Sequence, residues 1–225
     1  MAHSSAYVIM SRKSHMLRFA RAHGIKIPPS YMTLWPHFGA ASVYVLKEIQ
    51  KALKQTQTGV WDAKLQDALF VRVPDPQHLR VLALALSQVG VKESPPNSNS
   101  GPKVHEYQST TGAYGQAWCA SFAKWLLVRC GASQAQLAHA TADVTTWLAY
   151  PHMSAANVRP GDQVIYQWGG GDVDHIGTFY RWILKGHSFQ AVEGNTSVGN
   201  DSNGGEVMVR TRSVSSVAAF VRVAT

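Results

Sequence analysis

The sequence predicts an α+β protein in which a small all-α domain precedes a larger domain of helices followed by an antiparallel sheet. Up to about residue 130, apolar residues recur every three to four positions, the period of helices that pack by one face. After Pro160-Gly161 the period changes to two, which is typical of strands with one buried face. The two prolines of Val73-Pro74-Asp75-Pro76 stop both helix and sheet, so we place a linker there.

The first 30 residues are expected to form a basic arm. Residues 14–23 predict a short basic helix closed by Gly24. Residues 1–47 contain six Lys or Arg and no acid, whereas residues 48–225 contain 15 basic and 13 acidic residues. Such a segment suits an anionic partner, namely nucleic acid, anionic lipid or an acidic wall polymer; a solubilising tail and an organelle transit peptide are the alternatives. We expect no nucleic-acid binding, because the chain has no recognised motif for it.

Residues 31–73 are expected to form the all-α domain. The stretch Ile27–Pro36 is interrupted by prolines and is predicted to be irregular. A helix with one apolar stripe begins at Ser42 and ends near the turn Thr56–Gly59. A second short helix covers Ala63–Phe70 and repeats the pattern.

The composition excludes several classes of protein. Only 15% of the 225 residues are charged, so long charge-rich disordered tracts are excluded. Two cysteines cannot build a disulfide scaffold. The longest uncharged stretch, Ile27–Leu46, has the length of a membrane span, but its three prolines, one histidine and two serines argue against one.

The larger domain is expected to cover residues 78–225. Its predicted helices are His78–Val91 and Ala117–Cys130, with a loop at Ser94–Pro102 between them. Five stretches with a period of two are the predicted strands: Asp162–Tyr166, Ile176–Ile183, His187–Val192, Val207–Val214 and Ala218–Val223.

Cys119 has the position of a reactive thiol, just after a predicted helix start. There the helix dipole and free backbone N–H groups stabilise a thiolate. A helix that runs on to Cys130 separates the two cysteines by roughly 16 Å, too far for a disulfide. A small buried apolar residue is the alternative interpretation of Cys119, and for Cys130 it is the one we adopt.

A nucleophilic thiol needs a base and a group that orients the base. His175 follows a Gly-rich turn and opens a predicted strand, where a sheet can face a helix start. Glu193 and Asn195, at the end of the next strand, are two residues apart and share a face if the strand continues. The alternatives are a capping or core histidine and a strand-end turn.

These residues lie in motifs that resemble the CHAP family of cysteine, histidine-dependent amidohydrolases/peptidases. The motifs are Trp-Cys-Ala-Ser-Phe at 118–122, Pro-Gly-Asp at 160–162, Asp-His-Ile-Gly at 174–177 and Glu-Gly-Asn at 193–195. The resemblance runs from about Leu79 to the C-terminus. It implies a papain-like fold that cuts peptidoglycan, with Cys119 as nucleophile, His175 as base and Glu193 or Asn195 as the orienting group.

A related family of γ-D-glutamyl-diaminopimelate peptidases is the nearest alternative resemblance. It uses a second histidine as the orienting group, a position that His187 could imitate, but Glu-Gly-Asn fits the CHAP pattern better. Calcium-binding CHAP enzymes carry several acids before the nucleophile, whereas this chain has Asn97, Ser98 and Asn99 there. We therefore expect no structural metal and no cofactor.

The segment Val45–Phe70 resembles the small helical peptidoglycan-binding domain. The similarity rests on Ile49-Gln50-Lys51-Ala52-Leu53 and Thr58-Gly59-Val60-Trp61-Asp62, and it matches the later two thirds of that module best. An ordinary helical pair is the alternative. Two wall-directed resemblances in one chain support each other.

Together the resemblances imply an endolysin-like peptidoglycan hydrolase. It would cleave an amide of the stem peptide, the cross-bridge or the N-acetylmuramoyl-L-alanine link through a Cys119 thioester. The Cys119 backbone N–H and the Gln116 side chain are expected to stabilise the oxyanion, and Trp118 and the 97–101 loop with Asn99 to line the cleft.

Two other readings stay open: a catalytically inactive wall-binding protein and a secreted antibacterial amidase toxin. We expect a monomer whose partners are peptidoglycan and, through the basic arm, anionic wall or outer-leaflet polymers. No secretory signal is apparent, because the apolar run Ala6–Met10 is too short. A phage endolysin made in the host cytoplasm and released to the wall fits this best, and a virion-associated lysin is a further possibility.

Overall fold

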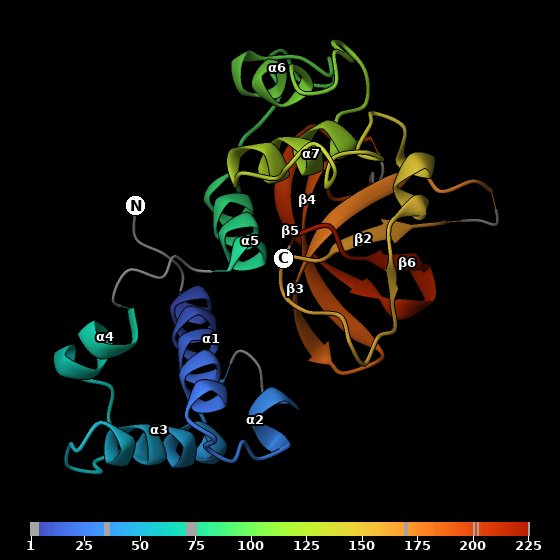
Figure 1. Cartoon of the computed structure of the whole chain (residues 1–225). Helices are drawn as coiled ribbons and strands as arrows, with labels where there is room; N and C mark the ends of the chain where they lie inside the picture. Colours follow the sequence, from blue (N-terminus) through green and yellow to red (C-terminus); the bar gives the residue numbers. More distant parts are fainter. Residues whose placement is uncertain are drawn as a thin grey trace. The chain divides into compact units, whose positions relative to one another are not determined.

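The computed structural model describes residues 5–33, 37–70, 76–168, 171–199, 201 and 203–224 (Figure 1). It divides into two compact units, Met1–Leu79 and Arg80–Thr225. Val73, Pro74 and Asp75 of the predicted linker lie outside the described residues. No helix in the described ranges combines the length and apolar character that a membrane crossing requires.

The first unit is all-helical. Its helices are α1 (Ser5–Ala22), α2 (Ser30–Thr33), α3 (Ala40–Ala52) and α4 (Ala63–Phe70). All four contribute to one core, whose buried members are Met16, Ala20, Tyr31, Val45, Leu46, Ile49, Leu65 and Leu69. The predicted helix pair is confirmed, and α4 has the predicted bounds.

The N-terminal segment differs from the separate arm that the charge pattern predicted. Helix α1 begins nine residues before the predicted 14–23, and Met16 and Ala20 lie in the core shared with α3 and α4. The described part of residues 1–30 therefore belongs to the helical unit. One turn of helix, α2, also interrupts the stretch that was predicted to be irregular.

One of the six early cations is buried. The Lys13 ammonium donates to the backbone oxygens of Tyr31 at 2.7 Å and His37 at 3.2 Å, and the Tyr31 hydroxyl donates to the Lys13 carbonyl at 2.6 Å. Burial lowers the pKa of Lys13 to about 8. This cation therefore joins α1 to the segment after it rather than adding to a basic surface.

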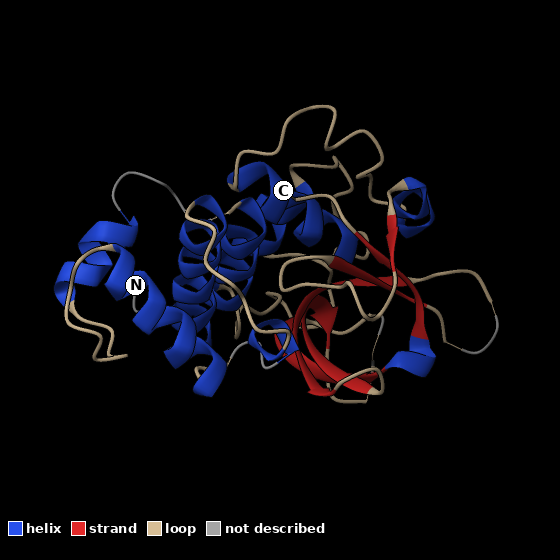
Figure 2. Cartoon of the chain, turned by 60° about the horizontal axis from the view of Figure 1, so that its bottom comes forward, coloured by secondary structure: helices blue, strands red, loops and turns tan. Residues whose placement is uncertain are grey.

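The second unit has helices first and a sheet after them, as predicted. Its helices are α5 (Gln77–Ser87), which starts just before the boundary between the units, α6 (Pro102–Gln108), α7 (Cys119–Arg129) and the 3₁₀ helices η1 (Val144–Ala149) and η2 (Val214–Ser216). Helix α6 was not predicted; Gly101 in a left-handed conformation and Pro102 at the first position start it. All described strands of the chain lie in this unit, in red in Figure 2.

The strands form one antiparallel sheet in the order β1-β6-β2-β3-β4-β5. Their bounds are β1 (His152–Met153), β2 (Gln163–Tyr166), β3 (His175–Leu184), β4 (Ser188–Thr196), β5 (Glu206–Ser213) and β6 (Val217–Val221). The five predicted strands are confirmed, and the two-residue β1 was missed. Helix α7 contacts β3 and β4, so its first residue lies beside the strands that carry the predicted base and orienting group.

Candidate active site

Cys119 is the first residue of α7, which begins two residues after the predicted start at Ala117. The preceding residue, Trp118, is the N-cap of the helix, and its side chain makes no capping hydrogen bond. No N-cap side chain therefore satisfies the backbone N–H groups of the first turn of α7. Neither cysteine forms a disulfide, both are buried, and Cys130 lies at the opposite end of the helix. The thiol is thus held where the helix dipole favours negative charge.

His175 is the first residue of β3, opposite Tyr166 of β2, and is fully buried. Its Nε2 lies 3.1 Å from the Glu193 Oε2, while Nδ1 has no hydrogen-bond partner of standard length in the described part of the chain. Burial alone lowers the pKa of His175, but the negative charges of a Cys119 thiolate and of the Glu193 carboxylate outweigh it and raise the pKa to about 9. The ring therefore favours the imidazolium form beside the thiol.

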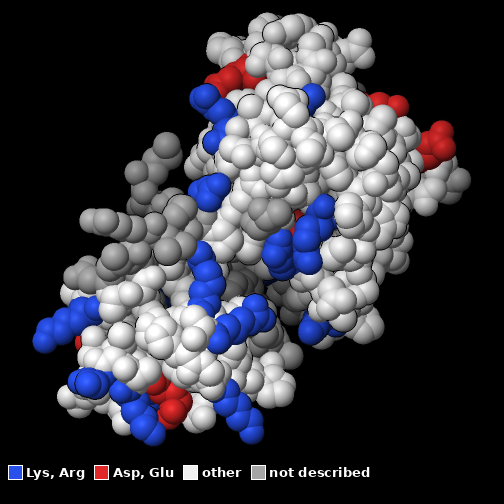
Figure 3. Space-filling view, in the orientation of Figure 1, with Lys and Arg blue, Asp and Glu red and all other residues white. Residues whose placement is uncertain are grey.

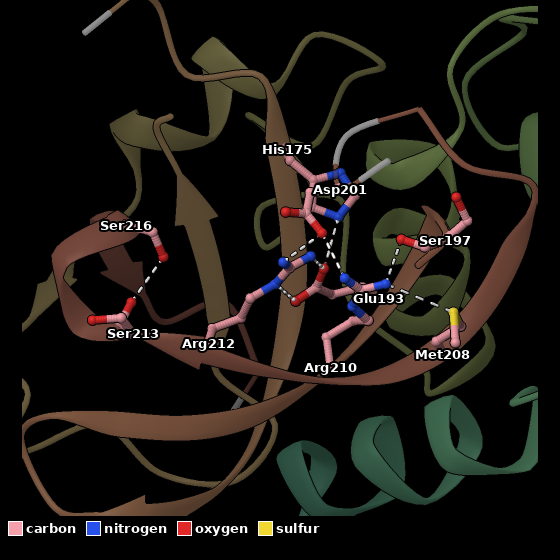
Figure 4. Close-up of polar contacts among 9 residues, drawn as sticks. All are labelled: His175, Glu193, Ser197, Asp201, Met208, Arg210, Arg212, Ser213 and Ser216. Atoms are coloured by element: carbon pink, nitrogen blue, oxygen red, sulfur yellow. Dashed lines mark hydrogen bonds and ion pairs between the residues drawn. The ribbon is translucent and has the colours of Figure 1, made fainter. Parts of the chain in front are cut away.

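Glu193 is fully buried in β4, opposite Gly177 of β3. Arg212 holds both carboxylate oxygens, with Nε donating to Oε1 at 2.9 Å and Nη2 to Oε2 at 2.6 Å (Figure 4). Burial raises the pKa of a carboxyl, but Arg212 and His175 outweigh burial here, and the pKa of Glu193 lies at about 2. Glu193 is therefore a charged acceptor for His175.

Asn195 is buried at the end of β4, two residues from Glu193, in a left-handed conformation with φ of 58°. Its Nδ2 donates to the Asn203 side chain at 3.4 Å, and its carbonyl accepts from the Gly204 N–H at 2.8 Å. Of the two candidate orienting groups, Glu193 makes the contact with His175, and Asn195 joins β4 to the segment before β5.

Trp118 does not line a cleft, contrary to the sequence-based expectation. Its side chain is fully buried, and its Nε1 donates to the Glu93 Oε1 at 2.8 Å. The other oxygen of Glu93 accepts from the Ser98 N–H at 2.9 Å. The ring packs in the core with Tyr107 and Phe122, and Glu93 connects it to the 97–101 loop.

Gln116 and Asn99 are brought together by a residue that the sequence reasoning missed. The buried Gln108 donates from Nε2 to the carbonyl oxygen of Asn99 at 3.0 Å and to that of Gln116 at 2.9 Å. The Gln116 residue itself is exposed, three residues before the nucleophile. Gln108 thus fixes two loops near the helix start through their backbones.

Trp168 is a second neighbour of the site that was missed. Its half-buried ring stacks on Tyr166 with centroids 5.1 Å apart, and its centroid lies 5.6 Å from that of His175. The Arg212 guanidinium lies 5.0 Å from the same ring. An aromatic followed by a Gly-rich turn just before His175 was the available signal.

Arg212, Arg210 and Asp201 extend the charged chain beyond Glu193. Asp201 Oδ1 lies 2.8 Å from Arg212 Nη1 and 2.6 Å from Arg210 Nη2. Two arginines at a spacing of two in a strand beside the one that carries Glu193 were the signal, because a buried carboxylate requires a cation.

His187 is wrong as an alternative orienting residue. It lies exposed in the turn between β3 and β4, whereas His175 opens β3 at the other end of that strand. Ten extended residues put the two histidines about 30 Å apart.

The Pro-Gly-Asp motif has a structural role. Asp162 is buried and accepts two bonds from Arg222, at 3.0 and 2.7 Å, and one from the Arg159 N–H at 2.9 Å. These contacts attach the segment after β6 to the start of β2.

The fold and site define an α+β protein with a buried Cys–His–Glu group at a helix N-terminus. No protein-family model matches the sequence, and no curated protein matches it. Within the described ranges, no group of three or more His, Cys, Asp or Glu side chains is arranged to hold a metal ion.

Gly194 is expected to be intolerant of a side chain. A Cβ there would lie 2.7 Å from Cζ3 of Trp118 and 2.9 Å from Cδ1 of Phe122, both buried rings of the α7 region. We expect Gly194→Ala to lower the free energy of unfolding of this unit by about 1–3 kcal/mol, measured by thermal and denaturant unfolding. Gly171→Ala is the control, since nothing lies within 4 Å of its Cβ. Equal stability of the two variants would contradict this packing.

The imidazolium of His175 is expected to persist well above neutral pH. With its pKa at about 9, the charged form contributes stability that is full below about pH 6.5, the ordinary value, and is lost as pH rises through 9. An NMR titration of the His175 ring measures this midpoint. In Cys119→Ala the midpoint should fall, because one of the two groups that raise it is gone; an unchanged midpoint would show that the thiol does not act on the ring.

Proposed function

We propose that the protein is a cysteine-dependent peptidoglycan hydrolase with a papain-like catalytic unit of the CHAP type. The observation that carries the proposal is the constellation at one end of the sheet. Cys119 opens α7, His175 opens β3 with a raised pKa, and the charged Glu193 contacts Nε2 of the imidazole. Nucleophile, base and orienting group are the three parts that acyl transfer by a thiol requires.

The reaction starts from the thiolate of Cys119 beside the imidazolium of His175, the pair that exists once His175 has taken the thiol proton. The thiolate attacks an amide carbonyl of the substrate, and the backbone N–H of Cys119 at the uncapped helix end stabilises the oxyanion, with Gln116 as a second donor. The imidazolium then protonates the leaving amine, which leaves a thioester on Cys119. Water, deprotonated by His175, hydrolyses the thioester and restores the thiol.

A wall substrate is supported by the motif resemblances and by the helical unit. That unit has a set of exposed cations, Arg18, Arg21, Lys26, Lys47, Lys51, Lys54 and Lys64. Figure 3 shows Lys and Arg spread over the visible face of this unit with few acidic groups. Such a surface favours anionic wall polymers. We propose a phage endolysin that reaches the wall after release as the setting for this activity.

Digestion of purified peptidoglycan tests the proposal. The full chain should release fragments whose new amino and carboxyl termini, read by mass spectrometry, identify the cleaved amide. Protein alkylated with iodoacetamide beforehand is the control and should release none. Absence of new termini from walls of several peptide chemistries would contradict the hydrolase.

A further inference from the structure

The contact between Glu193 and Arg212 is the most buried ion pair of the described chain that the proposed reaction does not use. The Arg212 side chain is 7% exposed and that of Glu193 is 0% exposed. The guanidinium makes two bonds to the carboxylate, and its remaining nitrogen reaches Asp201 at 2.8 Å. Figure 4 shows these groups in one chain from His175 to Arg210.

We propose that Arg212 is a positioning residue that keeps the Glu193 carboxylate charged and aimed at His175, and so maintains the thiolate–imidazolium pair of Cys119 and His175. The proposal rests on the proposed function only in treating Cys119 as a nucleophile. Arg212 touches neither the thiol nor the reacting atoms, and it acts through Glu193.

The shared oxygen is the first argument. Oε2 of Glu193 accepts from Arg212 at 2.6 Å and lies 3.1 Å from Nε2 of His175, so movement of the guanidinium moves the acceptor of the imidazole. Gly177 leaves room for this carboxylate arm, because a Cβ there would lie 2.7 Å from the Glu193 Cγ. The carboxylate is thus positioned by Arg212 in a space that the opposite strand leaves open.

The second argument is the state of charge. A buried carboxylate that loses one of its two cations is more easily protonated, and a neutral acid no longer stabilises an imidazolium. Arg212 is the strongest of the contacts that lower the pKa of Glu193 to about 2, and Glu193 is among the groups that raise the pKa of His175. Loss of Arg212 should therefore lower the pKa of the His175 imidazole.

The third argument is the shape of the guanidinium. Its centre lies 5.0 Å from the ring of Trp168 and 5.6 Å from that of Tyr166, where a flat cation fits. A lysine has the charge but neither the two-point fork nor the flat face. The titratable and charged groups around this guanidinium are Tyr166, His175, Glu193, Asp201 and Arg210, with Cys119 beyond His175.

The test compares three variants of the full chain, Arg212→Gln, Arg212→Lys and Arg210→Gln, by NMR titration of His175. In Arg212→Gln the midpoint should fall by about two pH units, a hundredfold loss of proton affinity, and in Arg212→Lys by about one. Arg210→Gln is the matched control. Arg210 also binds Asp201 but otherwise contacts the Ser197 carbonyl and Met208. The titration midpoint of His175 in Arg210→Gln should therefore stay within about 0.3 pH units of the wild-type value.

Alkylation of Cys119 by iodoacetamide at pH 7 gives a second reading, expected to slow about tenfold in Arg212→Gln and to be unchanged in Arg210→Gln. A wild-type midpoint in Arg212→Lys would overturn the proposal even if Arg212→Gln failed to fold, and so would an equal fall in Arg210→Gln. Neither measurement needs a substrate. If the His175 midpoint shifts as expected in the Arg212 variants but the wild-type protein cuts no peptidoglycan, the proposed function is refuted and this inference still holds.

Discussion

Replacing Cys119 by alanine is expected to abolish cleavage, with a residual rate at least about 10⁴-fold lower than that of the wild type. Without the sulfur there is no thiolate to attack the amide, and no thioester forms. The substitution removes one atom from a residue that is only 3% exposed, at a helix start that alanine also accepts, so the fold should persist. Clearing of a cell-wall suspension measures the rate, and sedimentation with insoluble peptidoglycan measures binding, which should remain.

Cys130→Ala is the matched control for this variant. Cys130 is also buried and outside any disulfide, at the other end of α7, and burial raises the pKa of its thiol to about 11. It should cleave at close to the wild-type rate, while His175→Ala should behave like Cys119→Ala. Cleavage retained by Cys119→Ala, or lost equally in Cys130→Ala, would remove Cys119 from the mechanism.

Replacing Glu193 by glutamine is expected to damage both activity and stability. The amide keeps the shape but removes the buried carboxylate that holds the Arg212 guanidinium and leaves it only the more exposed Asp201, which should lower the free energy of unfolding by about 3–5 kcal/mol. Loss of the acceptor that orients His175 should lower kcat/KM by about 10²- to 10⁴-fold. Denaturant unfolding and kinetics on soluble muropeptides measure the two effects.

Glu206→Gln is the control for Glu193→Gln. Glu206, at the start of β5, pairs at 3.4 Å with Lys92, whose side chain is 69% exposed. Solvent screens this pair, so we expect a change in stability within about 0.5 kcal/mol and unchanged kinetics. Similar losses in both variants would contradict the special position of Glu193.

The two variants should also differ in their response to acid. Because the pKa of Glu193 is lowered to about 2, its contribution to stability is complete above about pH 4.3, the ordinary value, and is lost as pH falls through 2. The stability of Glu193→Gln should therefore depend less on pH in this range than that of Glu206→Gln.

The positions of Cys119 and His175 could be predicted because their signals are local. The 3.6-residue period of α7 put Cys119 at a helix start, and the Gly-rich turn put His175 at a strand start. Continuation of β4 to Thr196, which keeps Glu193 in the strand, was left open by the sequence and is settled by pairing with β3 and β5. The placement of Trp118 in a cleft and the His187 alternative were wrong. A short motif predicts neither the burial of a side chain such as Trp118 nor the distance between two residues of a hairpin such as His175 and His187.

The basic N-terminus of the helical unit is a second case in which the sequence could not predict burial. The count of cations was correct, but the charge pattern predicted an arm where α1 packs into a core and buries Lys13. Charge composition shows how many charged residues a segment has, but not which of them become buried when the chain folds. Burial of the α1 apolar face against α3 and α4 outweighs the exposure that its charges suggested.

By itself the sequence determined the elements of this protein: an α+β chain, helices before strands, and the positions of Cys119 and His175 at the starts of elements. Periodicity and turn chemistry act over a few residues, so they can be read without the fold. Only the tertiary structure decided that Glu193 rather than Asn195 contacts the imidazole, and that Arg212 and Asp201 complete the charged chain. These contacts depend on strand register, which sets the distances between the side chains, and on burial, which sets the free energy of each charge. Register and burial are defined only after segments remote in the sequence have packed together.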